Sequence, residues 1–349
     1  MSVLIGGRAV GDGHPCFIIA EAGSNHDGKL AQALALIDVA AAAGADAVKF
    51  QVFRIDRLYP ERAGVSSYLE TPASIREVLA GLELPFDWLP ELAGHCAARD
   101  ICLLASAFDE ESADAVDAYV SAHKVASYEL TQLPLLRHIA GKGKPMILST
   151  GAADLGEVAW AVAELKRAGI AGGLVLMQCT AAYPAPLESL NVRAIQILKS
   201  RFEVPTGLSD HSRDPVLAPV SAVAAGANVI EKHFTLGNDL PGPDHAFALE
   251  PAELKLMVAK VREAELALGA GEKVVHAVEH ELRGFARRSL FATRDIGAGE
   301  SFASSDVTIL RNGELDPGLA PARLYELLDG RRARREIAAG APIREEDLA

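Results

Sequence analysis

Two segments of the chain, GLSDHS and VIEKHF, carry a histidine close to the end of a strand-like apolar run. Side chains alternate along a strand, so Ser209 shares a face with His211, and Glu231 shares a face with His233. If the two strands are neighbours, the two imidazoles lie side by side and, with oxygen ligands or water, make an open site for a catalytic divalent ion. Glu231 and Lys232 could form a local charge pair, and the sequence leaves their roles open. The pairing favours His211 and His233 as metal ligands over the alternative, in which each is a hydrogen-bonded structural residue near a strand end.

Other strand-like segments end in side chains that bind anions or move protons. Glu21 ends the first of them, and a carboxylate there serves either as a general acid or base or as a structural group bonded to nearby amides. The second carries Lys49 and Gln51 on one face, and a later one carries Lys124, followed closely by Ser127. Hydroxyl groups end three segments, at Ser106, Ser149 and Ser209. Two lysines, several hydroxyls, a carboxylate and a metal in one place suit an anionic phosphorylated substrate and a carbonyl group that must be polarised.

Eight strand-like runs alternate with amphipathic helical patterns, and these elements must position the polar side chains. The alternation is typical of β/α units around a parallel sheet. Eight units fit a closed (β/α)₈ barrel, usually about 250 residues long, better than the alternative, a doubly wound open sheet. Active-site residues of such barrels lie at the C-terminal ends of the strands, so a barrel would gather these side chains at one mouth. The eight runs span residues 16–21, 46–52, 101–106, 121–126, 144–149, 172–178, 204–209 and 228–234.

The last part of the chain has short extended segments with glycine-containing turns and an internal repeat. RDIGAGESFASSDV, from residue 294, matches REIAAGAPIREEDL, from residue 335. Two copies are too few for a solenoid, so the repeat indicates a compact β-rich domain with pseudo-symmetric halves. We therefore predict a barrel domain over residues 1–270, a linker over 271–287 and the β-rich domain over 288–349.

Composition narrows the class of partner and the compartment. The formal net charge of −13 argues against nucleic acid or an anionic membrane as a partner, because both require a cationic surface. The apolar runs are strand-sized, and the first residues show no leader pattern, so we expect a soluble cytoplasmic protein. The four cysteines are scattered without a Cys-x-x-Cys pair, which favours buried reduced thiols over disulfides or a metal cluster.

The ordered set of motifs resembles the sialic acid (N-acetylneuraminate) synthase family, which makes nonulosonic acids. Stretches near the C-terminus, RRSLFATRDIGAGE and the second copy of the repeat, resemble the antifreeze-like domain of that family. The resemblance covers nearly the whole chain and implies a TIM barrel followed by a small β-rich antifreeze-like domain. In the barrel it rests on FIIAEAGSNHDG, DAVKFQ, HKVASYEL, ILSTG, CTAAYPAP, GLSDHS, IEKHFTL and GPDHAFALEP.

The resemblance implies a reaction and a set of site residues. In that reaction C3 of phosphoenolpyruvate attacks the aldehyde of an open-chain N-acyl amino sugar, water adds at C2 and phosphate is released. A divalent ion, manganese or magnesium, would be held by His211 and His233 and would polarise the aldehyde. The catalytic positions match Glu21, the acid/base residue, with Lys49 and Lys124. Lys49, Lys124, Ser127, Ser149 and Ser209 also match positions that bind phosphoenolpyruvate, with Ser106 where a further hydroxyl is expected, and the sugar-side positions match Gln51, Tyr183 and Asp244.

The resemblance also implies a domain-swapped homodimer in which an arginine of the antifreeze-like domain reaches the partner's sugar. Arg311 is the matching position. Ala181 stands in CTAAYP where sialic acid synthases often carry Asn, and RNGELDPGL has extra residues between the arginine and Pro-Gly. The resemblance therefore indicates the reaction class but not which sugar is accepted, among sialic, legionaminic, pseudaminic and spore-coat types.

Two other functions are compatible with the same residues. A metal-dependent aldolase or lyase on the same barrel would use His211 and His233 to bind an enolate, and it would release no phosphate. A non-enzymatic carbohydrate- or ice-binding protein could be built on the C-terminal domain with the barrel as a scaffold, but this leaves the polar strand ends unexplained.

Overall fold

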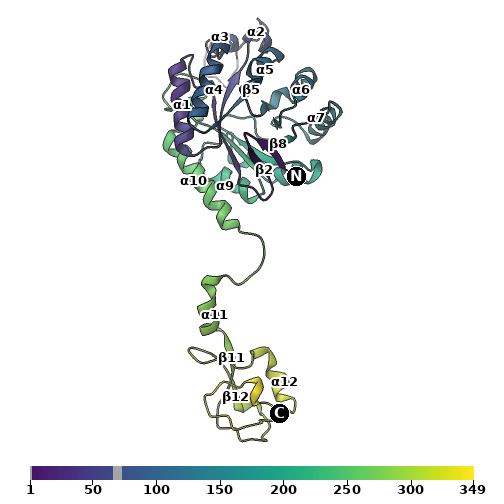
Figure 1. Cartoon of the computed structure of the whole chain (residues 1–349), viewed down its shortest axis with the longest axis vertical. Coiled ribbons are helices and arrows are strands. Elements are labelled where there is room, and N and C mark those ends of the chain that lie inside the picture. Colours follow the sequence, from purple (N-terminus) through teal and green to yellow (C-terminus); the bar gives the residue numbers. More distant parts are fainter. Residues whose placement is uncertain (1, 66–72) are drawn as a thin grey trace. The chain divides into compact units, whose positions relative to one another are not determined.

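The computed structural model describes residues 2–65 and 73–349. The chain divides into two compact units, Met1–Gly269 and Ala270–Ala349 (Figure 1). Each unit has its own hydrophobic core, so each is described by itself.

The first unit is a closed barrel of eight parallel strands, which confirms the predicted barrel and excludes the open sheet. Each strand pairs with the next along the chain, and the last pairs with the first. Every predicted run overlaps one of the strands, and four of the strands extend one or two residues beyond the predicted end. The strands are β3 (Phe17–Gly23), β4 (Ala47–Val52), β5 (Cys102–Ala107), β6 (His123–Val125), β7 (Met146–Ser149), β8 (Leu174–Cys179), β9 (Thr206–Asp210) and β10 (Val229–His233).

Helices cover the outside of the barrel, and their apolar faces form the main core with the outward side chains of the strands. Local signals set their ends. Asp154 and Glu157 form a capping box that begins α7, and Gly44 ends α1 in the left-handed conformation. The helices are α1 (Leu30–Ala43), α2 (Ile55–Leu58), α3 (Ile75–Ala80), α4 (Leu89–Ala98), α5 (Glu110–Asp117), α6 (Leu133–Ala140), α7 (Leu155–Arg167), α8 (Ala194–Phe202), α9 (Leu217–Ala224) and α10 (Pro251–Leu268). Within the described residues, no helix combines the length and the hydrophobicity that a membrane crossing needs.

A short hairpin precedes the barrel and closes its bottom. Strands β1 (Ser2–Ile5) and β2 (Arg8–Gly11) pair antiparallel, and Val3, Ile5 and Val10 pack on the apolar lower layer of the barrel interior. Sequence reasoning did not predict this hairpin, because its four-residue strands are too short to show a clear pattern. The barrel interior is therefore apolar below, and only the upper layer is left for polar side chains.

The second unit contains α11 (His280–Ala286), β11 (Arg288–Ala292), β12 (Val307–Arg311) and α12 (Leu324–Leu328). The two copies of the repeat make equivalent contacts. Arg294 donates to Asp306 at the same place in the first copy as Arg335 donates to Asp347 in the second. The copies meet in an antiparallel bridge between residues 296 and 337. The internal repeat therefore corresponds to pseudo-symmetric halves of one small core.

Candidate active site

The upper layer of the barrel interior gathers the polar strand ends that the sequence predicted. Every second residue of a strand points inward, so one side chain from each of seven strands reaches this layer, and an eighth strand adds Cys179. All of them are buried. The polar members are Glu21, Lys49, Ser106, Lys124, Ser149, Ser209 and Glu231, with His211 and His233 just above them.

Lys49 connects the carboxylates of this layer. Its Nζ lies 2.8 Å from an oxygen of Glu21 and donates to the hydroxyl of Ser106 at 2.8 Å. The same Nζ lies 3.5 Å from Glu231. Since two carboxylates surround it, the pKa of Lys49 is raised although burial opposes this, so the ammonium group stays charged.

Glu231 connects Lys124 to the charge network around Lys49. The sequence had left this role of Glu231 open. One of its oxygens accepts from Ser209 at 3.1 Å and lies 3.8 Å from Nζ of Lys124. Burial raises the pKa of Glu231, but the charges of Lys124 and Lys49 outweigh this and bring it below its usual value. Burial lowers the pKa of Lys124. An incoming anion would therefore find two ammonium groups whose present partners are buried carboxylates.

Glu21 differs from Glu231 in its protonation. Burial raises the pKa of Glu21 to about 7 against the opposing charge of Lys49. One oxygen of Glu21 accepts from the amide of Gln51 at 3.4 Å. A carboxyl group that titrates near neutral pH can both take up and release a proton, which is what a general acid or base requires.

His211 and His233 lie side by side, as their placement on β9 and β10 predicted. Their ring centroids are 5.4 Å apart. Nδ1 of His211 lies 2.8 Å from the carbonyl oxygen of Thr180, so a proton on Nδ1 leaves Nε2 with a free lone pair. Burial, together with the neighbouring His211, holds the pKa of His233 well below its usual range, so this imidazole is neutral.

The hydrogen-bond partners of the ring nitrogens in these two histidines are compatible with binding of a divalent ion. Nδ1 of His233 is buried without a hydrogen-bond partner among the described residues, and it lies 3.6 Å from a carboxylate oxygen of Asp244. Metal-ligating histidines are neutral, and their other ring nitrogen commonly donates to a carbonyl, as His211 can to Thr180. No cluster of three or more His, Cys, Asp or Glu ligands occurs in the described ranges.

A cavity of about 570 Å³ opens above this layer. Gln51, Ser127, Tyr183 and Asp244, which the sequence predicted as substrate-binding residues, line it together with His233. The ring of Tyr183 stacks at 4.2 Å between centroids on His211. Ser127 Oγ accepts from the backbone N–H of Gly151 at 2.9 Å. The predicted sugar-side residues therefore share one cavity beside the histidine pair.

The residue after Asp244, His245, contacts the loop that follows β3. The ring of His245 is fully buried and lies 3.0 Å from Asp27 through Nε2 and 2.6 Å from the hydroxyl of Thr235 through Nδ1. Gly23, which ends β3 with a φ of 55°, leaves room for Asp244, because a Cβ there would lie 3.3 Å from its carboxylate. These contacts join the ends of β3 and β10 around the cavity.

Comparison with known proteins decides the family. The NeuB family model matches residues 36–273, which is more than half of the chain. The chain belongs to the NeuB family. A SAF domain model matches residues 287–349. The resemblance to sialic acid synthases with an antifreeze-like domain is thereby confirmed.

Relatives of this NeuB-family chain match it along nearly its whole length. It is 44% identical to a spore coat polysaccharide biosynthesis protein, SpsE, of Bacillus subtilis, over 99% of this chain and 96% of the relative. It is 39% identical to an N,N'-diacetyllegionaminic acid synthase of Legionella pneumophila, over 95% and 94% respectively. A crystal structure of an N-acetylneuraminic acid synthetase of Leptospira borgpetersenii, in complex with citrate, superposes with a TM-score of 0.74 at 33% identity, over 81% of this chain and 95% of that one.

Sequence reasoning missed a buried carboxyl group that lines the NeuB-family cavity, that of Glu129. It lies in a short 3₁₀ helix (Ser127–Thr131) after β6, is only 8% exposed and lines the cavity with Tyr183 and Asp244. One of its oxygens has no hydrogen-bond partner among the residues described, and burial raises its pKa to about 7. The sequence signal for Glu129 is its position five residues after Lys124 in HKVASYEL. By itself, this position looks like the solvated start of a helix.

Two charged residues of the NeuB-family chain lie away from this layer. Lys232 points outward from β10 and is buried against Asp210 of β9, at 2.5 Å, so this pair joins two strands and faces away from the cavity. Arg311 lies in the second unit, exposed at the end of β12. The first unit therefore supplies the predicted site residues other than Arg311.

Proposed function

We propose that this protein condenses phosphoenolpyruvate with an open-chain N-acyl amino sugar to give a nonulosonic acid and phosphate. The observation that carries the proposal is one buried layer that holds Lys49, Lys124 and Glu21 directly below a pair of adjacent histidines. The NeuB-family match and the synthases among the relatives support the same reaction. An N-acetylneuraminate synthase-like transferase is therefore the activity to test.

The lysines and hydroxyls would bind phosphoenolpyruvate. Its phosphate and carboxylate groups need cationic and hydroxyl donors, which Lys49, Lys124 and the four serines of the mouth supply. The Nζ atoms of Lys49 and Lys124 face Glu21 and Glu231. The charges of this layer are therefore balanced before the substrate binds. The serines are Ser106, Ser127, Ser149 and Ser209.

The bond changes of the proposed reaction balance with one water molecule. A carbon–carbon bond forms between C3 of phosphoenolpyruvate and C1 of the sugar as the C2–C3 and aldehyde π bonds open, and the former aldehyde oxygen takes up a proton. Water adds at C2, and the C2–oxygen bond to phosphate breaks, which leaves a keto group at C2. Of the two protons of the water, one ends on the new hydroxyl group and the other on phosphate. The proton that leaves this water would be taken by Glu21, whose pKa of about 7 suits that use. A divalent ion, manganese or magnesium, held by His211 and His233 would act as a Lewis acid on the sugar aldehyde.

The sugar would lie in the cavity that Gln51, Tyr183, Asp244 and Glu129 line. The rest of its wall is largely apolar, formed by Phe53, Leu58, Ile75, Leu79, Leu82 and Phe108, with Ala181 close to Tyr183. An apolar wall favours methyl groups over hydroxyl groups. We therefore favour a diacetamido-trideoxyhexose, which has three methyl groups, over N-acetylmannosamine.

Phosphate release tests the reaction directly. Purified protein with manganese should release phosphate from phosphoenolpyruvate only when an accepted sugar is present, and a chelator should stop the release. We expect a higher kcat/KM with a diacetamido-trideoxyhexose than with N-acetylmannosamine. Sugar conversion without phosphate release would favour the aldolase instead, and no turnover of any sugar by metal-loaded protein would count against the proposed reaction.

The same proposal includes a division of labour between the units and a domain-swapped homodimer. We assign catalysis to residues 1–270, a linker to 271–287 and sugar capping to 288–349.

Three apolar side chains at helical spacing in and before α11 are largely exposed. They are Val278, Leu282 and Phe285, which are 88%, 65% and 50% exposed. Such a stripe on a short helix is more stable when another surface covers it, and a second copy would do so. Free cysteines throughout the chain suit the reducing cytoplasm.

Arg311 of one subunit would then reach the sugar in the partner's barrel. It is exposed, and within the described ranges its guanidinium forms no ion pair. We expect Arg311→Ala to raise KM for the sugar by about tenfold or more, since a hydrogen bond to a charged group contributes roughly 1.5–3 kcal/mol. KM for phosphoenolpyruvate should change less than threefold. Equal changes for both substrates, or none, would place Arg311 outside the sugar site.

Burial of Glu129 predicts a dependence of stability on pH. The pKa of Glu129 is raised from 4.5 to about 7, so the folded protein binds this proton more tightly than the unfolded chain. The stabilising contribution is complete below pH 4.5 and is lost as the pH rises through 7, a difference of about 3 kcal/mol at pH 8. Glu129→Gln should therefore melt at a higher temperature than the wild type at pH 8, and the gain should shrink at pH 5. An equal gain at both pH values would contradict the shift.

A further inference from the structure

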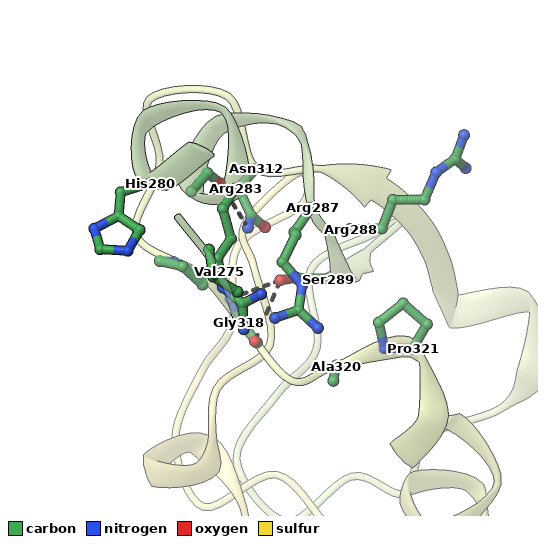
Figure 2. A pocket seen from close by; sticks show the side chains of 12 residues that line it. Val275, His280, Arg283, Arg287, Arg288, Ser289, Asn312, Gly318, Ala320 and Pro321 are labelled. Carbon is green, nitrogen blue, oxygen red and sulfur yellow. Dashed lines mark hydrogen bonds between the residues drawn. The ribbon is translucent and has the colours of Figure 1, made fainter. Parts of the chain in front are cut away.

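The second unit contains a cavity of its own, of about 840 Å³. Helix α11, the start of β11 and the segment 312–321 form its walls. Figure 2 shows the side chains that line it. None of them belongs to the proposed reaction, so this cavity is a separate place where a ligand could bind.

Three arginines line this cavity, and one of them, Arg288, donates to the carbonyl of Ile309 at 3.3 Å. Arg283 and Arg287 line it, and in the part of the chain that the structure describes neither side chain forms an ion pair or a hydrogen bond. Arg287 extends toward Ser289 and Gly318, whereas Arg288 extends away from them (Figure 2). Five other arginines of this unit pair with carboxylates, namely Arg294, Arg323, Arg331, Arg335 and Arg344. Arg311, Arg332 and Arg334 form no ion pair among the described residues, but they do not line the cavity. On a chain with a net charge of −13, two unpaired guanidinium groups in one hollow point to an anionic ligand.

Asn312 adds a second, independent indication. Its side chain is only 3% exposed and lines the cavity, and its Nδ2 donates to the carbonyl of Gly284 at 3.3 Å. Its Oδ1 is buried without a hydrogen-bond partner among the described residues. A buried acceptor without a partner costs free energy unless a donor reaches it. The ligand should therefore carry a hydroxyl or N–H group as well as a negative charge.

We propose that this cavity is a second binding site, which takes a small hydroxylated carboxylic acid. The carboxylate would lie against Arg283 and Arg287, which can each donate two parallel hydrogen bonds. A hydroxyl or amide N–H of the ligand would donate to Oδ1 of Asn312 once this side chain turns to bring the buried oxygen to the cavity surface. Pro317 and Pro321 would contact its carbon skeleton.

Calorimetric titration with N-acetylneuraminic acid tests the site, because this probe has a carboxylate, hydroxyls and an amide N–H. The full-length protein should bind it at a site that survives Lys124→Ala, a substitution that disables the barrel mouth. The double variant Arg283→Ala with Arg287→Ala should weaken this binding about tenfold or more. N-acetylmannosamine, which has no carboxylate, should not occupy the site.

Two further variants test whether binding of the probe depends on this cavity. Arg334→Ala removes an exposed arginine outside the cavity and should leave the affinity unchanged. Asn312→Asp keeps the side-chain shape but adds a negative charge, so it should weaken binding of the acid. Phosphate release at low product concentration should be unaffected in the double arginine variant, so failure of this site and failure of the proposed reaction are separable.

Several outcomes would overturn the second site. One is an affinity that the double arginine variant does not change, and another is binding that disappears with Lys124→Ala alone. A third is a double variant that becomes monomeric in light scattering while the wild type binds no probe. That result would assign Arg283 and Arg287 to a contact between subunits.

Discussion

His211→Ala and His233→Ala should each abolish metal-dependent turnover while leaving the fold intact. Each variant removes one of two imidazoles whose rings lie 5.4 Å apart above the lysine layer. With one imidazole, the site retains few ligands of its own, so the affinity for manganese should fall strongly. Because polarisation of the aldehyde contributes several kcal/mol, we expect kcat to fall by about a thousandfold or more. Phosphate release with added manganese, together with calorimetric manganese binding, measures both effects.

His138→Ala is the matched control. His138 belongs to α6 on the outside of the barrel, where it pairs with Asp114, so its loss should change neither metal affinity nor turnover. Circular dichroism of all three variants would show whether the fold survives. Wild-type turnover in His211→Ala or His233→Ala, from metal-depleted protein with manganese restored, would rule this site out. It would also reopen the carbohydrate-binding function, in which the barrel is only a scaffold.

The sequence predicted the barrel because alternation of side chains is a local property. Glu21, Lys49 and Glu231 each follow apolar residues at a spacing of two, so their inward direction could be inferred before any pairing was known. The neighbouring position of His211 and His233 then followed from consecutive strands of one parallel sheet. The predicted layer of site residues therefore needed only the strand period and the closure of the barrel.

What the sequence could not show depends on distances between loops. The 3₁₀ turn that places Glu129 against the cavity has no periodic pattern, and the contact between His245 and Asp27 joins residues 218 positions apart. The closing hairpin has strands of four residues, too short for a period to appear. The cavity beside Arg283 depends on which arginines find carboxylates, and an arginine-rich sequence does not reveal that.

Glu21→Gln should cause the second large loss of activity, and it distinguishes chemistry from binding. The amide has nearly the shape of the carboxyl group but cannot accept or release a proton at neutral pH. General acid or base catalysis typically contributes about a hundredfold to ten-thousandfold, so we expect kcat to fall within that range. Phosphoenolpyruvate should still bind, because Lys124 is retained and Lys49 keeps its contacts with Ser106 and Glu231.

The direction in which kcat changes with pH shows whether Glu21 acts as a base or as an acid. Burial raises the pKa of Glu21 to about 7, so a role as the base that receives the proton of the added water requires the ionised form. The wild-type kcat should therefore rise as the pH increases from 6 to 8, and the residual kcat of Glu21→Gln should lose this rise. Glu129→Gln, which changes the other carboxyl group with a pKa near 7, should keep the rise and increase KM for the sugar. A wild-type kcat that falls over the same interval would make Glu21 the acid, and a rise that survives in Glu21→Gln would move the titrating group elsewhere in the mouth.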